Sequence, residues 1–364
     1  MNLRDKALDI WRAGVAAVDG YAATARALPP QAPDRILAVG KAAGHMARAA
    51  LDRYGDIPCI VVTKDGHAGD LPAHVTLIEA AHPVPDARSL SGGRALRGAV
   101  EGMGAGTRLL LLVSGGASAL AEDPVEGETL DSLAALNRAL LASGLDIGEM
   151  NVRRRVMSRI KGGGLLSRFG GARVDVLAIS DVPRDDIAVI GSGIGAAPED
   201  ARFAYHCDIV ASNAIARDAA VAAAGDLTVL CNNDGLHGDA ARIAGELGPR
   251  IAAMEPGVMV IGGEPTVVLP DTPGEGGRNQ MLALALSEYI VGRDDIVIVV
   301  GGTDGSDGPT DAAGGVVDGT TWTQGAAAAL ARADSGPFLQ ARGARLVTGP
   351  TGTNVMDLAI ALRA

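Results

Sequence analysis

The sequence predicts an α/β protein with two domains. Short apolar runs rich in β-branched residues, such as residues 296–300, alternate along the chain with segments of helical periodicity. Several of these runs end abruptly in glycine-rich polar loops, and α/β proteins bind their ligands in loops beyond the carboxyl ends of strands. The 364 residues are too many for one comfortable hydrophobic core, so two domains are expected.

Composition and charge restrict the class of protein. Hydrophobic residues make up 48% of the chain and charged residues 21%, which is typical of a soluble globular protein. The 50 glycines follow no period and lie between apolar runs, which excludes collagen-like and disordered chains. A net charge of −11 disfavours a general nucleic-acid binder, but a locally basic pocket could still bind an anionic substrate.

The cysteines and the apolar runs indicate the compartment. Cys59, Cys207 and Cys231 lie in or beside apolar runs without metal-ligand spacing, so we interpret them as buried thiols in a reducing compartment. No apolar stretch reaches membrane-spanning length without glycine or charge, and the N-terminus lacks the apolar core of a signal peptide. We therefore expect a cytoplasmic protein with no membrane segment.

The first elements place a lysine at the start of a helix. Residues 3–28 have helical spacing and are expected to form one packing helix. A strand over residues 36–39 then runs through Gly40 and Lys41 into an alanine-rich helix that ends near Tyr54. Helix N-termini attract anions, and a lysine adds a full charge, although a solvated lysine would look the same. The loop is not a Walker A motif.

The next strong feature is a serine–glycine loop. Strands are expected over residues 59–63 and 75–79, followed by a helix over residues 89–100. The very hydrophobic strand 108–113 ends in a loop that makes a good backbone nest for an anion, with the candidate residues Ser114, Gly115, Gly116 and Ser118. A serine nucleophile is the alternative, but the G-x-S-x-G motif is absent, which argues against hydrolase chemistry.

A basic segment follows the helical pattern of residues 129–145. Residues 151–164 carry five cations and end in Lys161, Gly162 and Gly163, which either form a solvated face or approach a phosphate or carboxylate closely. A strand over residues 174–179 leads to Asp181. The glycines of residues 191–196 match a dinucleotide-binding pattern, but the context of a strand before and a helix after is poor, so we interpret the match as fortuitous.

The C-terminal part repeats the arrangement of strand, loop and helix. Pro256 and Gly257 are interpreted as a hinge, which gives domains of residues 1–255 and 256–364. The strand 258–262 leads to Glu264, and Arg278 and Asn279 open a helix that ends near Ile290. An arginine at this place offers a planar fork to a carboxylate or phosphate.

An aspartate-rich loop follows the strand 296–300. It contains Thr303, Asp304, Asp307 and Asp311 among glycines, a pattern that either holds a hard cation such as Mg²⁺ or simply forms turns. After a helix over residues 323–333, a polar loop that includes Asn354 is expected to lead into a last helix.

Taken together, these segments resemble the glycerate 2-kinase family with its MOFRL-type C-terminal domain. The motifs that carry the resemblance extend in order over nearly the whole chain: V-G-K-A-A from Val39, H-P-V-P-D from His82, S-G-G from Ser114, S-R-I-K-G-G from Ser158, S-D-V-P from Ser180, G-G-E-P-T from Gly262, G-G-R-N-Q from Gly276, G-T-D-G-S-D-G-P-T-D from Gly302 and T-G-P-T-G-T-N from Thr348. One such motif would be weak support, whereas the ordered set is specific.

The resemblance implies a reaction, a fold and a site. The reaction is ATP- and Mg²⁺-dependent transfer of phosphate to the 2-hydroxyl of D-glycerate, which gives 2-phosphoglycerate. The fold is two α/β domains, the larger N-terminal one Rossmann-like with a mostly parallel sheet, and the active site in the cleft between them. The expected partners are D-glycerate and ATP, with no nucleic acid and no membrane; a homodimer is left open.

The resemblance also assigns residues. Its lysine maps to Lys41 and its arginine to Arg278, one for phosphate and the other for the carboxylate, and Asp181 is the third catalytic candidate. Asp304 and Asp307 are the candidates for the metal, while Asp311 is as well explained as a turn former. The expected substrate- and nucleotide-binding residues are Ser114, Gly115, Gly116, Ser118, Lys161, Gly162, Gly163, Glu264, Asn279, Thr303 and Asn354.

The sequence departs from the family pattern at Ala117, at Arg184 and in the loop of residues 191–194, where the family has glycine, glycine and Ala-Ser-Gly-Pro. These departures bear on substrate identity more than on the reaction class. Three alternatives therefore stay open: an NAD(P)H-dependent hydroxypyruvate reductase, a kinase for a related small hydroxy acid, and a nucleotide sensor without chemistry.

Overall fold

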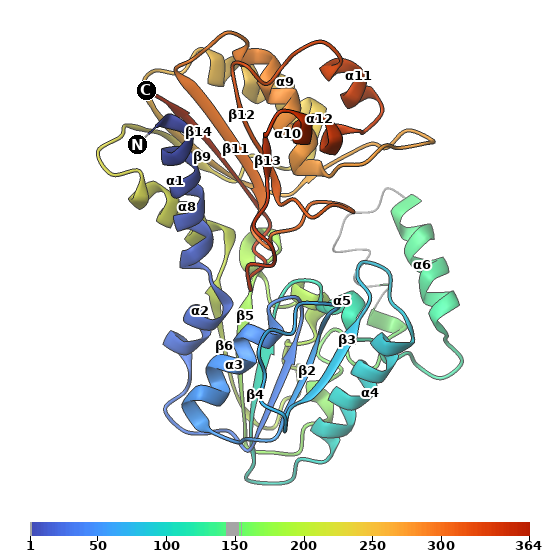
Figure 1. The fold of residues 1–364 in the computed structure, drawn as a ribbon. Helices are drawn as coiled ribbons and strands as arrows, with labels where there is room; N and C mark the ends of the chain where they lie inside the picture. The colour runs from blue at the N-terminus through green and yellow to red at the C-terminus, as the bar shows by residue number, and fades with distance from the viewer. Residues whose placement is uncertain (1, 143–152, 154) are drawn as a thin grey trace. The chain divides into compact units, whose positions relative to one another are not determined.

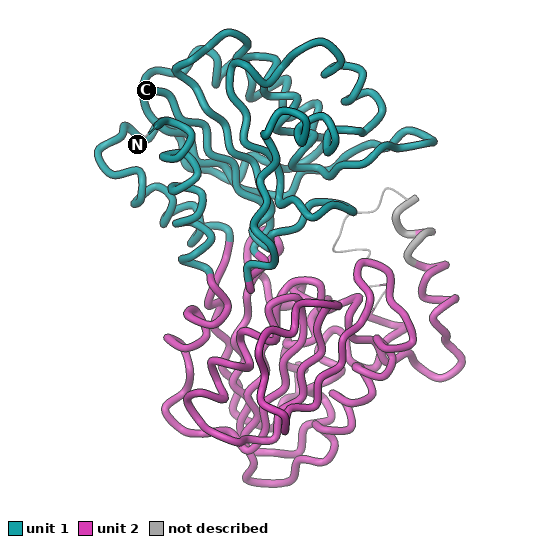
Figure 2. Tube along the Cα trace, in the orientation of Figure 1, with its two compact units in different colours: residues 1–18, 213–351, 355–364 teal, residues 19–212, 352–354 magenta. Residues whose placement is uncertain are grey.

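The computed structural model describes residues 2–142, 153 and 155–364, and these residues form two compact units (Figures 1 and 2). Unit 1 comprises residues 1–18, 213–351 and 355–364, and unit 2 comprises residues 19–212 and 352–354. Each unit contains a six-stranded sheet with helices, so the predicted α/β class with two domains is confirmed.

The division between the units differs from the predicted boundary at residues 255/256. Helix α8 (Asn213–Ala223) packs against the N-terminal helix α1 (Leu3–Ala17), and strand β7 (Val229–Asn233) pairs in parallel with β9 (Gly257–Gly263). Residues 213–255 therefore belong to the sheet of unit 1 together with the C-terminal segment. Pro256 immediately precedes β9, whose first residue is Gly257, and both residues lie inside unit 1.

The sheet of unit 2 is entirely parallel, as expected, with the strand order β3-β2-β1-β4-β5-β6 of a doubly wound dinucleotide-type fold. Its strands are β1 (Arg35–Val39), β2 (Cys59–Lys64), β3 (Thr76–Ala80), β4 (Arg108–Val113), β5 (Arg173–Ile179) and β6 (Ala204–Ala211). Because the chain turns outward in opposite directions from β1 and β4, the carboxyl ends of these two neighbouring strands mark the topological switch point.

In unit 2, α2 (Gly20–Ala27) precedes β1, and the helices α3 (Ala43–Tyr54), α4 (Ala87–Glu101), α5 (Ala117–Leu120) and α6 (Leu130–Ala142) lie between successive strands. One face of the central strands contributes Leu37, Leu111 and Val176 to a core that α4 and α5 cover. The single helix expected over residues 3–28 is in fact two helices, since Asp19 leaves the helical conformation and its side chain caps the start of α2.

The sheet of unit 1 is mixed, with the order β13-β12-β11-β14-β9-β7 and only the β7–β9 pair parallel. The remaining strands are β11 (Ile296–Gly302), β12 (Gly314–Asp318), β13 (Arg345–Leu346) and β14 (Asp357–Arg363), and β8 (Gly238–Asp239) pairs separately with β10 (Pro265–Thr266).

Two helical layers cover this sheet. Alternate residues of β11 divide between them: Ile298 packs with the layer of α9 (Ala240–Ala252) and α10 (Arg278–Ser287), and Val299 packs with α1 and α8. The short helices α11 (Ala326–Ala331) and α12 (Ser335–Ala341) extend the first layer. Trp11 of α1 is buried against the sheet and donates its indole N–H to the carbonyl of Leu358, 3.1 Å away.

The last element is a strand and not the predicted helix. Residues Asp357–Arg363 form β14, which lies between β11 and β9 and is buried along nearly its whole length. A short apolar run that is covered on both faces cannot be distinguished from a buried helix by periodicity, and here pairing with two neighbouring strands decides the outcome.

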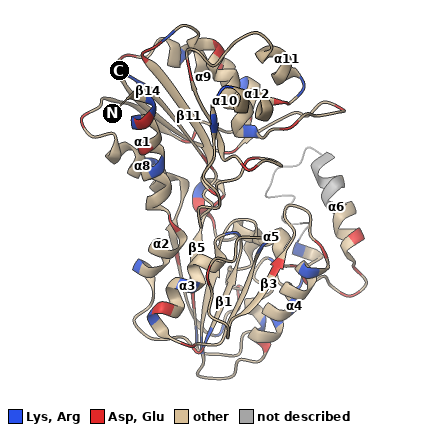
Figure 3. Cartoon of the chain, viewed as in Figure 1, with Lys and Arg blue, Asp and Glu red and all other residues tan. Residues whose placement is uncertain are grey.

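The surface of the described residues carries both signs of charge. Figure 3 shows lysines, arginines and acidic residues interspersed over both units in this view. Among the described residues, no helix combines the length and apolar character needed to cross a membrane. The cysteines are free thiols, with Cys59 buried and Cys207 and Cys231 partly buried, close to the expectation of buried thiols.

Candidate functional site

The predicted site residues fall into two groups, one in each unit, and each group is described by itself. In unit 2 the group surrounds the switch point. Strands β1 and β4 pair in register up to Val39 and Val113, so Gly40 and Ser114 follow them side by side. The Gly40–Lys41 turn and the serine–glycine loop thus meet where a doubly wound fold binds its ligand.

Glycine is required at the first of these turns. Gly40 has a φ of 123°, and a Cβ atom there would lie 2.2 Å from Oγ of Ser114. The hydroxyl of Ser114 is buried and accepts the N–H of Ala42 at 3.0 Å, while the N–H of Lys41 donates to the carbonyl of Gly115 at 2.9 Å. These N–H groups are satisfied by the protein itself. Ser114 therefore supports the start of α3, and of the predicted anion-binding features at this turn the ammonium group of Lys41 and the helix dipole remain.

Lys41 and His82 flank Gly116. A Cβ atom on Gly116, whose φ is 83°, would lie 3.2 Å from both the His82 ring and Cγ of Lys41. Both side chains are partly exposed. His82 follows β3, and it was not among the residues selected from the sequence because a lone loop histidine is more often structural. Because it lies beside Lys41, His82 is a further candidate site residue.

Asp181 and Asn354 lie directly over Gly115. The Asn354 amide is 3.4 Å from Oδ2 of Asp181, and a Cβ atom on Gly115 would meet both side chains at little more than 2 Å, namely at 2.1 and 2.2 Å. The short segment of residues 352–354 belongs to unit 2, where Gly352 lies against the His45 ring of α3. The structure therefore brings the predicted residues Asp181, Asn354 and Gly115 together at the switch point.

The two remaining glycine-rich segments of unit 2, around residues 162–163 and 191–196, are hydrogen-bonded to each other. The N–H groups of Gly162 and Gly163 donate to the carbonyls of Ser192 and Gly193, each at 2.9 Å, and the hydroxyls of Ser118 and Ser192 are 2.9 Å apart. The predicted binding loop thus uses its N–H groups for internal structure. The loop of residues 191–196 forms a short turn, which agrees with our interpretation that its dinucleotide pattern is fortuitous.

Lys161 is committed to a buried ion pair. Its ammonium group contacts Glu122, and both side chains are almost fully buried. The hydroxyl of Ser158 donates to the other oxygen of the same carboxylate. Lys161 is therefore placed to hold this segment together, and contact with a nucleotide stays a prediction. Of the predicted basic segment, residues 151, 152 and 154 lie outside the described residues.

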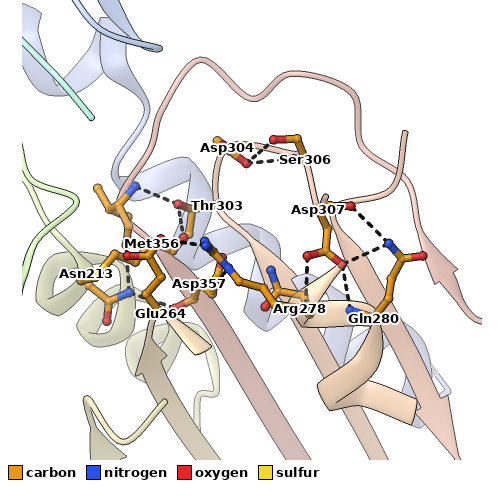
Figure 4. A network of polar contacts seen from close by, with 12 residues as sticks. Asn213, Glu264, Arg278, Gln280, Thr303, Asp304, Ser306, Asp307, Met356 and Asp357 are labelled. Carbon is orange, nitrogen blue, oxygen red and sulfur yellow. Dashed lines mark hydrogen bonds and ion pairs between the residues drawn. The ribbon is translucent and has the colours of Figure 1, made fainter. Parts of the chain in front are cut away.

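In unit 1 the group centres on Arg278, the first residue of α10 (Figure 4). Its Nε and Nη2 atoms donate to the two carboxylate oxygens of Asp357 at 2.6 and 3.2 Å, and Nη1 donates to Glu264 at 2.7 Å. The side chain of Asp357 is 1% exposed, whereas that of Glu264 is 47% exposed. Asp357 was not predicted as a site residue.

Charge and burial oppose each other in this cluster. Burial alone lowers the pKa of Arg278, but the adjacent Asp357 carboxylate outweighs burial, so the pKa lies above its usual value and the guanidinium stays charged. Burial raises the pKa of Asp357, and the guanidinium opposes that rise. The predicted clamp is thus an arginine whose orientation is set by protein carboxylates.

Asp307 caps α10. Its carboxylate accepts the N–H groups of Asn279 and Gln280 at 3.0 and 2.8 Å and the side-chain amide of Gln280 at 3.0 Å. A Cβ atom on Gly277 would lie 2.2 Å from Cγ of Asp307, so glycine is needed for this approach. Asn279 is fully buried on the first turn of the helix. These contacts give Asp307 a structural task, and its predicted metal ligation stays a prediction.

Thr303 fixes the segment that precedes β14. Its N–H and hydroxyl groups donate to the carbonyl of Met356 at 3.0 and 2.7 Å, and its hydroxyl accepts the N–H of Val355 at 2.9 Å. The side-chain amide of Asn213 donates to the carbonyls of Val355 and Asp357. The predicted binding residue Thr303 therefore acts on the backbone beside Asp357.

Of the two predicted metal residues, Asp304 is the better placed. It is 6% exposed, and one of its oxygens accepts the N–H and hydroxyl groups of Ser306 at 2.9 and 3.0 Å. Within residues 2–142, 153 and 155–364, no three His, Cys, Asp or Glu side chains gather as a metal-binding group. Asp311, expected to form a turn, makes an ion pair with Arg345.

Asp307 gives a prediction about pH. Burial raises its pKa from 3.8 to about 6, against the opposing effect of the N–H donors. Because the folded pKa exceeds the unfolded value, the folded state binds the proton more tightly. Stability contributed by this group is therefore present below pH 4 and falls as the pH rises to about 6, by about 3 kcal/mol.

Asp307→Asn lacks this titration. The difference in free energy of unfolding between wild type and variant, measured by denaturant titration at pH 4 and pH 7, should therefore shift by that amount; a difference that does not depend on pH contradicts the assignment.

Comparisons with known proteins identify the family of this chain. Residues 6–225 match the model described as a domain of unknown function (DUF4147), and residues 257–357 match the MOFRL family. The D-glycerate 2-kinase of Thermotoga maritima is 34% identical, with 99% of this chain and 98% of that protein covered. An Agrobacterium vitis protein provisionally named a hydroxypyruvate reductase is 38% identical, with 89% and 97% covered. A crystal structure of Thermotoga maritima glycerate kinase matches with a TM-score of 0.86 at 32% identity, covering 100% of this chain and 99% of that one.

Proposed function

The chain belongs to the glycerate 2-kinase family, and on that premise we propose that it transfers the γ-phosphoryl group of ATP to the 2-hydroxyl of D-glycerate, giving 2-phosphoglycerate and ADP. The observation that carries the proposal is the place of Lys41 at the switch point of the parallel sheet, beside Gly116 and at the start of α3. A lysine at that point suits the oxygens of a transferring phosphate.

Phosphoryl transfer requires positioning and charge compensation more than covalent chemistry from the protein. The 2-hydroxyl oxygen attacks the γ-phosphorus, the bond to the ADP oxygen breaks, and the hydroxyl proton must pass to a base. Asp181 is a carboxylate at the switch point and takes that proton in our assignment. Lys41 compensates the charge on the phosphate oxygens.

Arg278 is assigned to the glycerate carboxylate. A guanidinium group has five N–H donors, and among the described residues three of them, one on each nitrogen, donate to Asp357 and Glu264. One N–H on each terminal nitrogen is left, which is enough for one carboxylate. Arginine suits this task because its planar fork binds both oxygens of a carboxylate.

The donor set of unit 1 fits Mg²⁺ in part. Mg²⁺ is commonly held by one or two carboxylates together with substrate phosphates, so a three-residue cage is not required. Asp304 is the carboxylate that would hold it, whereas Asp307 is occupied by α10. When bound, the ion would neutralise charge on the β- and γ-phosphate oxygens.

The reductase is the second candidate, because the Agrobacterium vitis relative carries that name. A nicotinamide cofactor would require a glycine-rich loop between a strand and a helix with N–H groups turned toward its pyrophosphate. In this chain the matching loop accepts hydrogen bonds from Gly162 and Gly163 and continues into no helix, which favours the kinase.

Location and assembly extend the proposal. The free thiols and the use of ATP support the cytoplasm as the compartment. The homodimer stays a prediction that the mass in solution would decide.

The proposal is tested by a coupled ADP-release assay. Purified protein with ATP and Mg²⁺ is given a panel of three- and four-carbon hydroxy acids, and NMR locates the phosphate in the product. We expect turnover with D-glycerate and a 2-phosphate product. If only another acid is phosphorylated, the protein is a kinase with a different substrate. Oxidation of NADH in the presence of hydroxypyruvate would instead establish the reductase. Nucleotide binding without any turnover would indicate a sensor.

A further inference from the structure

We propose that Asp357 is the positioning residue for Arg278, so that binding of the acceptor acid depends on a buried carboxylate that does not itself touch the acid. The proposal rests on the proposed function, because it concerns the same reaction. It assigns different tasks to the two carboxylates that contact Arg278.

Asp357 makes the stronger of the two ion pairs with Arg278. Both of its oxygens bind the same edge of the guanidinium, formed by Nε and Nη2, and its side chain is 1% exposed. Bidentate pairs of this kind fix the plane of the guanidinium as well as its distance. Glu264 makes a single contact and its side chain is 47% exposed, and exposed ion pairs contribute little because water competes for both groups.

Asp357 is itself held from several sides. It is the first residue of β14, where it pairs with Gly302 of β11 and Gly263 of β9. The amide of Asn213 holds its carbonyl, and Thr303 holds the carbonyl of the preceding residue (Figure 4). The carboxylate therefore extends from a central strand whose backbone is paired on both sides.

Asp307 fixes the other end of Arg278. By accepting the N–H groups of the first turn of α10, it sets the backbone from which the arginine side chain extends. Backbone and guanidinium are thus held by two different carboxylates. With backbone and guanidinium both held, the N–H groups that remain on the terminal nitrogens keep a fixed position, which preorganises a long flexible side chain for an anion.

The test is Asp357→Asn, which keeps the size of the side chain and removes the charge and one acceptor oxygen. We expect the KM for the acceptor acid to rise by roughly 100-fold, the effect of misplacing a binding group by about 1 Å, with the KM for ATP unchanged. The double variant with Arg278→Lys should have an acceptor KM little higher than that of Arg278→Lys alone, because both changes disrupt the same Arg278–Asp357 pair.

Asp295→Asn is the matched control. Asp295 forms a bidentate ion pair with Arg293 and a single contact with Arg363 in the same unit, at the opposite ends of β11 and β14. We expect this variant to lower the melting temperature and leave both KM values unchanged. If Asp357→Asn fails to fold, Asp357→Glu keeps the buried charge, shifts the guanidinium by the length of one methylene, and should also raise the acceptor KM.

The results separate the two proposals. A wild-type protein that phosphorylates no acid overturns the proposed function. An active wild type whose Asp357→Asn variant loses melting temperature but keeps the acceptor KM overturns the positioning role alone. Independent, multiplying effects of Asp357→Asn and Arg278→Lys would also overturn it.

Discussion

Replacing Lys41 with alanine is expected to remove most of the turnover while the protein stays folded. The lysine is partly exposed, and the hydrogen bond that it gives to the Gly115 carbonyl comes from its backbone N–H, which alanine retains. Loss of a charged contact to a transferring phosphate raises the barrier by about 3 kcal/mol, or roughly 100-fold in kcat. The expected signature is a fall in kcat with an unchanged melting temperature.

Lys64→Ala is the control for this result. Lys64 ends β2, the neighbour of β1 in the same sheet, so its removal takes one positive charge from the same edge. We expect near-normal turnover from this variant. If Lys41→Ala keeps more than about a tenth of the wild-type turnover, or if both variants lose activity equally, then Lys41 does not act on the phosphate and the effect is one of general charge.

Much of the fold of unit 2 could be predicted because its strands are local features of the sequence. Short apolar runs that end in polar, glycine-rich loops show strands such as β1 and β4 without knowledge of their neighbours. Unit 1 depends on pairings between distant parts of the chain. The packing of α1 on α8 and the insertion of β14 between β11 and β9 have no local signal, so the last strand was missed and the place of residues 213–255 in unit 1 was not foreseen.

The same distinction applies to the site. Strand-end reasoning selected Lys41 and Asp181 as candidates, and a predicted helix start selected Arg278. It could not show that Ser114, Lys161 and Thr303 bind the protein itself, because their partners lie in other segments. One signal for Asp357 was available: a carboxylate that opens an apolar run is buried only with a partner, and that implies a nearby cation. The identity of that cation, 79 residues away, required the structure.

Arg278→Lys is expected to fail although it keeps the positive charge. Lysine offers a point charge and cannot form the parallel hydrogen bonds that arginine makes with Asp357 and with a bound carboxylate. A 2-hydroxyl misplaced by about 1 Å loses roughly 100-fold in rate. If Arg278 holds the acceptor, the KM for glycerate rises more than the KM for ATP; the reverse pattern would assign Arg278 to the phosphate and leave the carboxylate to Lys41.

Arg293→Lys separates this effect from general loss of an ion pair, since Arg293 forms a bidentate contact with Asp295 in the same unit. Both variants are expected to lose some thermal stability, and only Arg278→Lys should change steady-state kinetics with varied glycerate and varied ATP. Near-normal turnover of Arg278→Lys with unchanged glycerate dependence would show that the two terminal nitrogens of Arg278 do not bind the substrate carboxylate. Arg278 would then be a structural arginine that neutralises Asp357, whose burial without a cation is unfavourable whether or not a substrate is bound.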